Sequence, residues 1–358
     1  LRPLLIGTAT LVLVGALTAV LYRPHPLALT TRNAIPVTSE PGIEFQPALS
    51  PDGHLLAFAT VSERRTLIAV RSTSGSSRGT EVRPIDNNSD DQALPTWSAD
   101  GERVRFLSVQ HAGGRLQPFG WPGTPHSVTW NEMERLGGAS HRVEIPRESQ
   151  WSAWSRDGAR AAFAVADSIF VYDSAEHRTQ LLTVHPKGWS PHSLAWSPDG
   201  RWIAYVNGNP FWPTGWNTAP SSIWLVGVED GARIPVTDAA HLNVSPVWLD
   251  ARNLLFVSDL DGQREVYTVE VGSSGPRAPA VKVPGGTDAH SISVSADGSR
   301  LAVAKLIARQ NVRSFPLTAT RPLTAHEGDL VTSGSQVVET HDVSQDGEWL
   351  AYDTNLHG

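Results

Sequence analysis

Short apolar runs alternate with polar, turn-forming residues along most of the chain, and one such unit returns many times. A clear copy has an apolar segment ending in Trp196, the turn Ser197-Pro198-Asp199-Gly200, and a second apolar segment from Trp202 to Tyr205. Apolar runs this short suit β-strands better than helices. Pro fixes φ, Asp accepts hydrogen bonds from nearby amides, and Gly supplies a left-handed conformation, as a hairpin turn requires. The unit therefore predicts a β-hairpin.

This unit occurs seven times, and each copy carries an aspartate at its turn. The aspartates return every 42 to 57 residues, a period typical of propellers and solenoids. We expect them to have a structural role, because no other titratable residue recurs beside them. The fifth copy departs from the pattern, since Ala251 replaces the glycine. The seven turn aspartates are Asp52, Asp100, Asp157, Asp199, Asp250, Asp297 and Asp346.

Two further β-rich runs follow each hairpin before the next copy begins. In the fourth unit they are Ser222 to Val226 and Arg233 to Thr237. Four strands in each period match the blade of a β-propeller, and no helical pattern intervenes to suggest a parallel sheet. The sequence therefore predicts an all-β propeller of four-stranded antiparallel blades over residues 34–358. Seven repeats are visible, and the last is truncated after two strands.

The N-terminal region differs sharply from the repeats. Residues 3–22 carry no charge and consist mostly of Leu, Val and Ala, which is long enough to span a bilayer. The alternative is a secretory signal peptide, whose apolar region is usually shorter. We expect one transmembrane helix over 3–22, a linker over 23–33, and then the propeller. Residues 34–38 resemble a fourth strand, so we also expect them to complete the blade that the seventh copy begins.

Two units contain long insertions with aromatic residues in Gly- and Pro-rich loops. In a propeller such loops share one face with the residues that enter each inner strand, at the mouth of the channel. Loops carry function more often than strands do, although aromatic side chains usually pack. We therefore consider a ligand rim, with packing of the aromatic residues as the alternative. The candidate rim residues are Trp121, Phe211, Trp212, Trp216, Gln150, His192, Asn243, His290 and His341.

Composition excludes several kinds of chemistry. The formal net charge is −7 with no run of Lys and Arg, which argues against non-specific nucleic-acid binding. The chain has no cysteine, so it has no disulfide, thiolate nucleophile or cysteine-bound zinc. It lacks H-E-x-x-H, phosphate-loop and dinucleotide-binding patterns. Gly75 to Gly79 fits G-x-S-x-G, but this stretch lies in a polar run between strands rather than before a helix. We predict no catalytic residue, no metal and no cofactor.

The repeats resemble the TolB-type, WD-repeat-like propeller family of bacteria, whose blades carry P-x-W-S-P-D-G-x-x-I/L-A-F/Y. The best matches are Pro95 to Gly101 and Leu194 to Tyr205. The resemblance covers about residues 34–358, and it implies a fold rather than a function. The order of helix, short linker and blades further resembles the outer half of membrane-anchored bacterial serine/threonine protein kinases. His290 to Gly298 and Asp342 to Tyr352 look closest to that subgroup.

From these features we expect a single-pass membrane protein with a propeller on the extracytoplasmic, periplasmic side. The propeller would be a non-catalytic module that binds a protein, peptide or glycan ligand, and its parent would be a receptor-type kinase whose kinase domain is not in this chain. Three alternatives remain open: the propeller of a prolyl-oligopeptidase-type serine peptidase, a TolB-like periplasmic scaffold, and the sensor half of a winged-helix transcription regulator.

Overall fold

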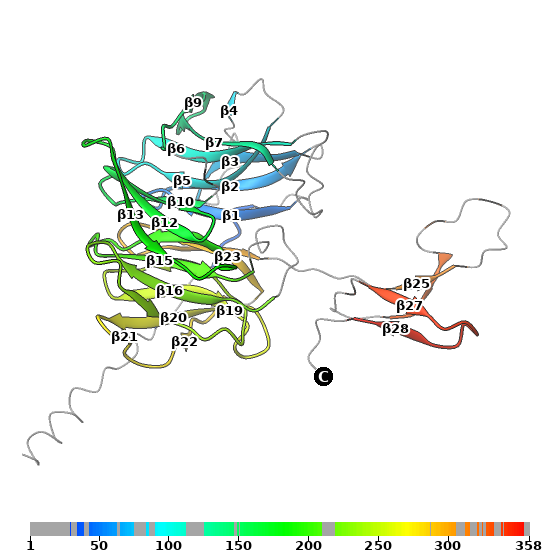
Figure 1. The fold of residues 1–358 in the computed structure, drawn as a ribbon. Coiled ribbons are helices and arrows are strands. Elements are labelled where there is room, and N and C mark those ends of the chain that lie inside the picture. The colour runs from blue at the N-terminus through cyan, green and yellow to red at the C-terminus, as the bar shows by residue number, and fades with distance from the viewer. Residues whose placement is uncertain are drawn as a thin grey trace, which may run out of the picture.

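The computed structural model shows a β-propeller whose blades are antiparallel sheets arranged around an axis (Figure 1). The predicted all-β class and antiparallel blades are confirmed. The structure describes residues 29, 34–38, 43–62, 65–74, 84–85, 90–111, 125–146, 149, 151–209, 219–286, 288–305, 312–315, 321, 324, 327–332, 338 and 340–353. No helix in these residues is long and apolar enough to cross a membrane. The helix predicted over 3–22 and the linker over 23–33, apart from Leu29, lie outside the described residues.

Five sheets of three to five strands form the blades. Blade 1 contains β1 (Glu44–Leu49), β2 (Leu55–Ser62) and β3 (Arg65–Ser72). Blade 2 contains β5 (Asp91–Trp97), β6 (Arg103–His111), β7 (Pro125–Glu134) and β9 (His141–Arg142). Blade 3 contains β10 (Trp151–Trp154), β11 (Arg160–Val165), β12 (Ser168–Asp173) and β13 (Arg178–Val184).

The remaining blades follow in chain order. Blade 4 contains β14 (Pro191–Trp196), β15 (Trp202–Asn207), β16 (Ser222–Gly227) and β17 (Arg233–Pro235). Blade 5 contains β18 (Asn243–Trp248), β19 (Asn253–Ser258), β20 (Glu265–Gly272), β21 (Gly275–Pro276) and β22 (Val281–Lys282). A short parallel pair, β4 (Pro84–Ile85) with β8 (Gly138–Ala139), accompanies blades 1 and 2.

A two-stranded sheet closes the ring between blade 5 and blade 1. It consists of β23 (Ala289–Val294) and β24 (Leu301–Lys305), and β23 contacts both β18 and β1. The Gln46 amide donates to Ser291 Oγ at 2.9 Å, and the Leu49 amide donates to Ser293 Oγ at 2.9 Å. The sixth repeat therefore lies directly against the first, and no further blade fits between them.

The structure has five blades rather than seven, so the expectation that the seventh copy begins a further blade of the ring is wrong. The seventh repeat forms only the hairpin β27 (His341–Val343) and β28 (Leu350–Tyr352). It lies apart from the ring with the short pair β25 (Arg313–Ser314) and β26 (Asp329–Leu330), as Figure 1 shows. Its Trp349 side chain is 74% exposed. Residues 34–38 do not form the expected strand, although Val37 packs against the cluster that contains Leu49 and Phe58.

The central strands of the blades are buried on both faces, because each blade packs between two others. In β15, Ile203, Ala204, Tyr205 and Val206 are all 0% exposed. Their side chains point alternately to the two neighbouring blades, since successive residues of a strand face opposite ways. This arrangement fixes the blades relative to one another. It leaves the two ends of the ring and its outer edges as the surfaces where a site can be built.

Candidate functional site

The shared shape of the hairpin corners comes from hydrogen bonds within each turn. In six of the seven copies the corner serine donates to the aspartate two residues later, at 2.5 to 2.7 Å. The same carboxylate oxygen accepts a backbone amide just after it, as in His54 N to Asp52 Oδ1 at 3.0 Å. In the fifth copy Leu249 replaces the serine, and Asp250 Oδ1 accepts the amides of Arg252 at 2.7 Å and Asn253 at 2.8 Å. Each aspartate thus lies in the turn where its pattern predicts it.

These bonds also account for the acidity of the corner carboxyls. The serine hydroxyl, and after it the backbone amide, lowers the pKa of Asp52, Asp100 and Asp157 below the usual value. The pKa of Asp297 falls to about 2, because Ser295 and Ser299 both donate to its carboxylate. A carboxylate stabilised in its ionised form is a poor general base or acid near neutral pH. The corners are therefore structural elements in this geometry.

The corners also bring blades together at one end of the ring. The Ala296 amide donates to the Pro51 carbonyl at 3.1 Å, which joins the sixth repeat to the first. Arg156 of the third corner reaches the Ala296 carbonyl at 3.4 Å. Indole groups add similar links along the inner strands: Trp97 Nε1 donates to the Ala48 carbonyl at 2.8 Å, and Trp248 Nε1 donates to the Ala195 carbonyl at 3.0 Å.

Three candidate rim residues lie at the first or second position of inner strands, and all three are buried. His192 is 0% exposed, and Asn243 and His290 are each 3% exposed. His192 Nε2 lies 2.6 Å from the Gly208 carbonyl, and Asn243 Nδ2 donates to the Ser221 carbonyl at 2.8 Å. Burial lowers the pKa of His192 to about 4, so its imidazole is neutral at pH 7. The His192 and Asn243 side chains therefore hold their strand entries to neighbouring loops.

The other rim candidates do not join them. His341 lies in β27, whose three residues are exposed and outside the ring. The remaining five lie outside the described residues: Trp121, Gln150, Phe211, Trp212 and Trp216. The aromatic rim therefore stays a prediction. Within the described part of the chain, no three His, Asp or Glu side chains gather closely enough to hold a metal ion.

Bulges in the inner strands are a feature that none of the sequence patterns above predicts. Gln46, Leu94, Ser193 and Ser245 occupy the same place, four residues before the corner, with φ of 49 to 53°. Each strand shifts register there, which is the signature of a β-bulge. The bulges link blades: Leu94 N donates to Gln46 Oε1 at 2.8 Å, and Ile292 N donates to Ser245 Oγ at 3.0 Å. Counting back from each corner would have located the position, but not its conformation.

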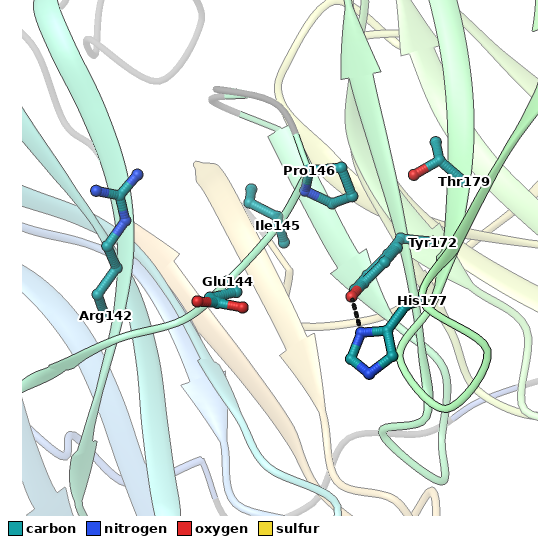
Figure 2. Close-up of a pocket in the computed structure, with 7 residues that line it drawn as sticks. All are labelled: Arg142, Glu144, Ile145, Pro146, Tyr172, His177 and Thr179. Atoms are coloured by element: carbon teal, nitrogen blue, oxygen red, sulfur yellow. Dashed lines mark hydrogen bonds between the residues drawn. The ribbon is translucent and has the colours of Figure 1, made fainter.

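A cleft opens between the outer parts of blades 2 and 3 (Figure 2). Its volume is about 570 Å³. One wall is the segment that leaves β9, and the other is the face of β12 and β13 with the turn between them. The Tyr172 hydroxyl lies 3.2 Å from His177 Nδ1, as the dashed line in Figure 2 shows. The lining residues are Arg142, Glu144, Ile145, Pro146, Tyr172, His177 and Thr179.

The segment that forms the first wall is anchored from behind. The Val143 amide donates to the Trp130 carbonyl at 2.8 Å, and Val143 and Ile145 pack on the cluster that contains Trp130 and Trp154. Arg142 and Glu144 alternate with these apolar residues and are both exposed. Among the described residues neither side chain has an ion-pair partner. The cleft thus presents a cation, a carboxylate, a phenol and an imidazole on a fixed scaffold.

Comparisons with known proteins agree with the fold. No protein-family model matches the sequence, and no curated protein matches it. Among solved structures, putative TolB from Agrobacterium tumefaciens is similar with a TM-score of 0.52 and 20% identity, covering 73% of this chain and 89% of that one. TolB from Acinetobacter baumannii has a TM-score of 0.49 and 17% identity, covering 65% of this chain and 53% of that one. At 20% identity the likeness to the first of these structures shows the fold alone, which is a TolB-like β-propeller.

Proposed function

We propose that this chain is a non-catalytic binding module: a propeller that engages a protein or peptide partner and is held at a membrane by residues 3–22. The observation that carries the proposal is the cleft between blades 2 and 3, with Arg142 and Glu144 lacking partners among the described residues. Clefts with a few convergent polar groups are the usual place for a ligand. The propeller would lie on the extracytoplasmic, periplasmic side.

The composition of the cleft favours binding over chemistry. Tyr172 and His177 form an exposed pair at 3.2 Å, and the groups opposite them are aliphatic or charged side chains suited to contacts. A cation and a carboxylate two residues apart recognise complementary charges on a ligand, while Ile145 and Pro146 offer apolar surface. Exposed ion pairs contribute about 0.2–1 kcal/mol each, so several contacts must act together. An extended partner that covers the cleft satisfies that requirement.

A finer proposal is that the propeller is the sensor of a receptor-type serine/threonine kinase. It is supported by the order of apolar N-terminal segment, short linker and blades. The coding sequence upstream of Leu1 tests it. A V-A-I-K and H-R-D pair there supports the kinase, whereas an α/β-hydrolase elbow next to the blades supports a peptidase and a winged helix supports a transcription regulator.

The binding role is tested with the full chain in lipid nanodiscs. A random linear peptide library and a glycan array are offered to the wild type, to Arg142→Ala/Glu144→Ala, and to Arg321→Ala/Glu327→Ala. The last variant removes one arginine and one glutamate that pair with each other outside the ring. It therefore matches the cleft variant in net charge. We expect defined peptides to bind the wild type and the control, and to lose at least tenfold in affinity for the cleft variant.

Several outcomes overturn this proposal. One is the absence of any peptide or glycan that binds the wild type. Another is equal binding by all three proteins, which places the site away from the cleft. Hydrolysis of peptides or transfer of phosphate by the purified chain alone contradicts the non-catalytic role.

A further inference from the structure

The outer strand of blade 3 is unusually long and exposed. β13 has 7 residues, whereas the outer strands β9, β17 and β22 of blades 2, 4 and 5 have 2, 3 and 2; blade 1 ends, in the described residues, with its third strand, β3. Leu181 and Val184 in β13 are each 51% exposed. In blade 4, by contrast, the outer-strand residue Ile234 is 8% exposed. A long, apolar edge strand is normally shortened, charged or covered, because it is a template for pairing with another strand.

The register of blade 3 shows which backbone groups of β13 face outward. His185 N donates to the Asp167 carbonyl at 2.9 Å, and bonded pairs alternate along an antiparallel ladder. On the other side of β12, Ser174 N donates to the Ala159 carbonyl at 3.1 Å. This bond shows independently which residues of β12 direct their amide and carbonyl groups toward β11 and which direct them toward β13, and it gives the same assignment. It follows that Thr179 and Leu181 direct their amide and carbonyl groups away from β12. Their neighbour Gln180 pairs inward with Val171.

The same residues face the cleft. Thr179 is paired with Tyr172 across the sheet, and cross-strand partners share a face. Both line the cleft, opposite Arg142 and Glu144 (Figure 2). Leu181 lies two positions further along the strand, before a bulge, and so projects on the same side. The open edge and the cleft therefore form one continuous surface.

We propose that β13 captures an extended peptide segment of a partner protein as a fifth strand of blade 3. This inference rests on the proposed binding function and names the form that the ligand takes. The main chain of the peptide pairs with Thr179 and Leu181, and alternate side chains enter the cleft. Strand addition of this kind gains affinity from main-chain hydrogen bonds and specificity from alternate side chains.

Charge and spacing define the chemistry of that peptide. Arg142 and Glu144 lie two residues apart, and alternate residues of an extended ligand are spaced by the same repeat of about 6.7 Å. A ligand with an acidic and a basic residue two positions apart complements both. Aliphatic residues further along the same face cover Leu181 and Val184. The partner that fits is thus an unfolded segment whose every second residue faces the cleft, and these residues are in turn an acidic one, a basic one and two aliphatic ones.

A synthetic peptide tests this directly: acetyl-Ser-Glu-Thr-Lys-Thr-Val-Thr-Leu-Ser-amide with a fluorescent label, and its reversed sequence for the other strand direction. Binding is measured by fluorescence anisotropy to the full chain and to two variants. Thr179→Pro removes the outward amide, while Thr179→Ala removes only the side chain. We expect one strand direction to bind, Thr179→Pro to weaken its binding about tenfold, and Thr179→Ala, which keeps the outward amide, to weaken it clearly less than Thr179→Pro does. Thermal unfolding of both variants checks that they remain folded.

A second pair of probes tests the peptide's own main chain. N-methylation of alternate residues in one phase blocks the amides that face β13, and N-methylation in the other phase leaves them free. We expect loss of binding in one phase only. Equal effects of both phases, equal binding by Thr179→Pro and Thr179→Ala, or no binding in either direction overturns the strand-addition proposal.

The two proposals fail in different ways. If library peptides bind the wild type and are lost on Arg142→Ala/Glu144→Ala, yet bind Thr179→Pro unchanged, the binding function stands and strand addition is wrong. If the wild type instead forms dimers by light scattering, and Thr179→Pro abolishes them, the occupant of the edge is a second copy and the peptide proposal is overturned.

Discussion

Two hairpins of this molecule have nearly the same sequence and the same turn but opposite surroundings. In the fourth repeat, Ser197 Oγ donates to Asp199 at 2.7 Å, and in the seventh, Ser344 Oγ donates to Asp346 at 2.5 Å. The strands after the turns read Trp-Ile-Ala-Tyr and Trp-Leu-Ala-Tyr. Tyr205 is nevertheless 0% exposed, whereas Tyr352 is 43% exposed.

The two hairpins show that the turn conformation depends on local residues, whereas burial depends on neighbouring blades. The corner needs only its own serine, aspartate and glycine, so it forms with or without a blade around it. Burial requires neighbours: the fourth repeat lies between two blades, and Trp248 of the fifth donates to its Ala195 carbonyl at 3.0 Å. In the part of the chain that the structure describes, the seventh hairpin does not lie between two blades, because β23 already lies against β1. The number of repeats in the sequence therefore gives the number of hairpins, not the number of blades.

The largest contrast is expected from the matched tyrosines. Tyr205→Ala leaves a cavity between blades and removes the bond from its hydroxyl to His185 Nε2 at 2.8 Å, so unfolding should become easier by about 3–5 kcal/mol. Tyr352→Ala should change the main transition by less than about 0.5 kcal/mol. Urea unfolding followed by tryptophan fluorescence measures both. Similar losses for the two variants would mean that the seventh hairpin is part of the packed ring.

The next contrast is between the buried His192 and the exposed His341. Because the pKa of His192 is about 4 in the folded chain and 6.5 in the unfolded one, the unfolded state takes up a proton first as pH falls. The stability that neutral His192 contributes is fully present above pH 6.5 and is lost between pH 6.5 and about 4, by up to about 3 kcal/mol.

Urea unfolding at several pH values between 7 and 4 checks this dependence. His192→Gln should flatten the fall in stability, although His185, whose pKa is also lowered by burial, leaves part of it. His341→Gln is the control on the exposed hairpin and should leave the profile unchanged. An unchanged profile in His192→Gln would show that this imidazole is not buried as neutral.

The smallest contrast concerns the corner serines. Ser197 is 0% exposed and its hydroxyl accepts the Trp202 amide at 2.9 Å, so Ser197→Ala should destabilise the ring by about 1–2 kcal/mol. Ser344→Ala removes the same bonds from the hairpin outside the ring and should not shift the main transition. Calorimetry of the two variants is sufficient. A shift of equal size in both would couple the seventh corner to the ring.

The same difference between local and distant contacts explains which features could be predicted from the sequence. Corner turns and antiparallel strands were predictable, because Ser, Asp and Gly act within a few residues of each other. The blade count was not, because it depends on Ser291 and Ser293 meeting the amides of blade 1 across about 245 residues. The cleft was not predictable either, since Arg142 and Tyr172 belong to no sequence motif and line the same cleft only because blades 2 and 3 pack together. His192 and Asn243 lie at strand entries, and their burial depends on loops elsewhere in the chain.

An engineered disulfide tests whether β23 closes the ring against β1. The chain has no cysteine, so Leu49→Cys/Ser293→Cys and Leu49→Cys/Val343→Cys each contain a single defined pair. Leu49 N lies 2.9 Å from Ser293 Oγ, and we predict that the first variant forms an intramolecular disulfide on mild oxidation while the second does not. A disulfide in the second variant and none in the first would place the seventh repeat, rather than the sixth, beside blade 1.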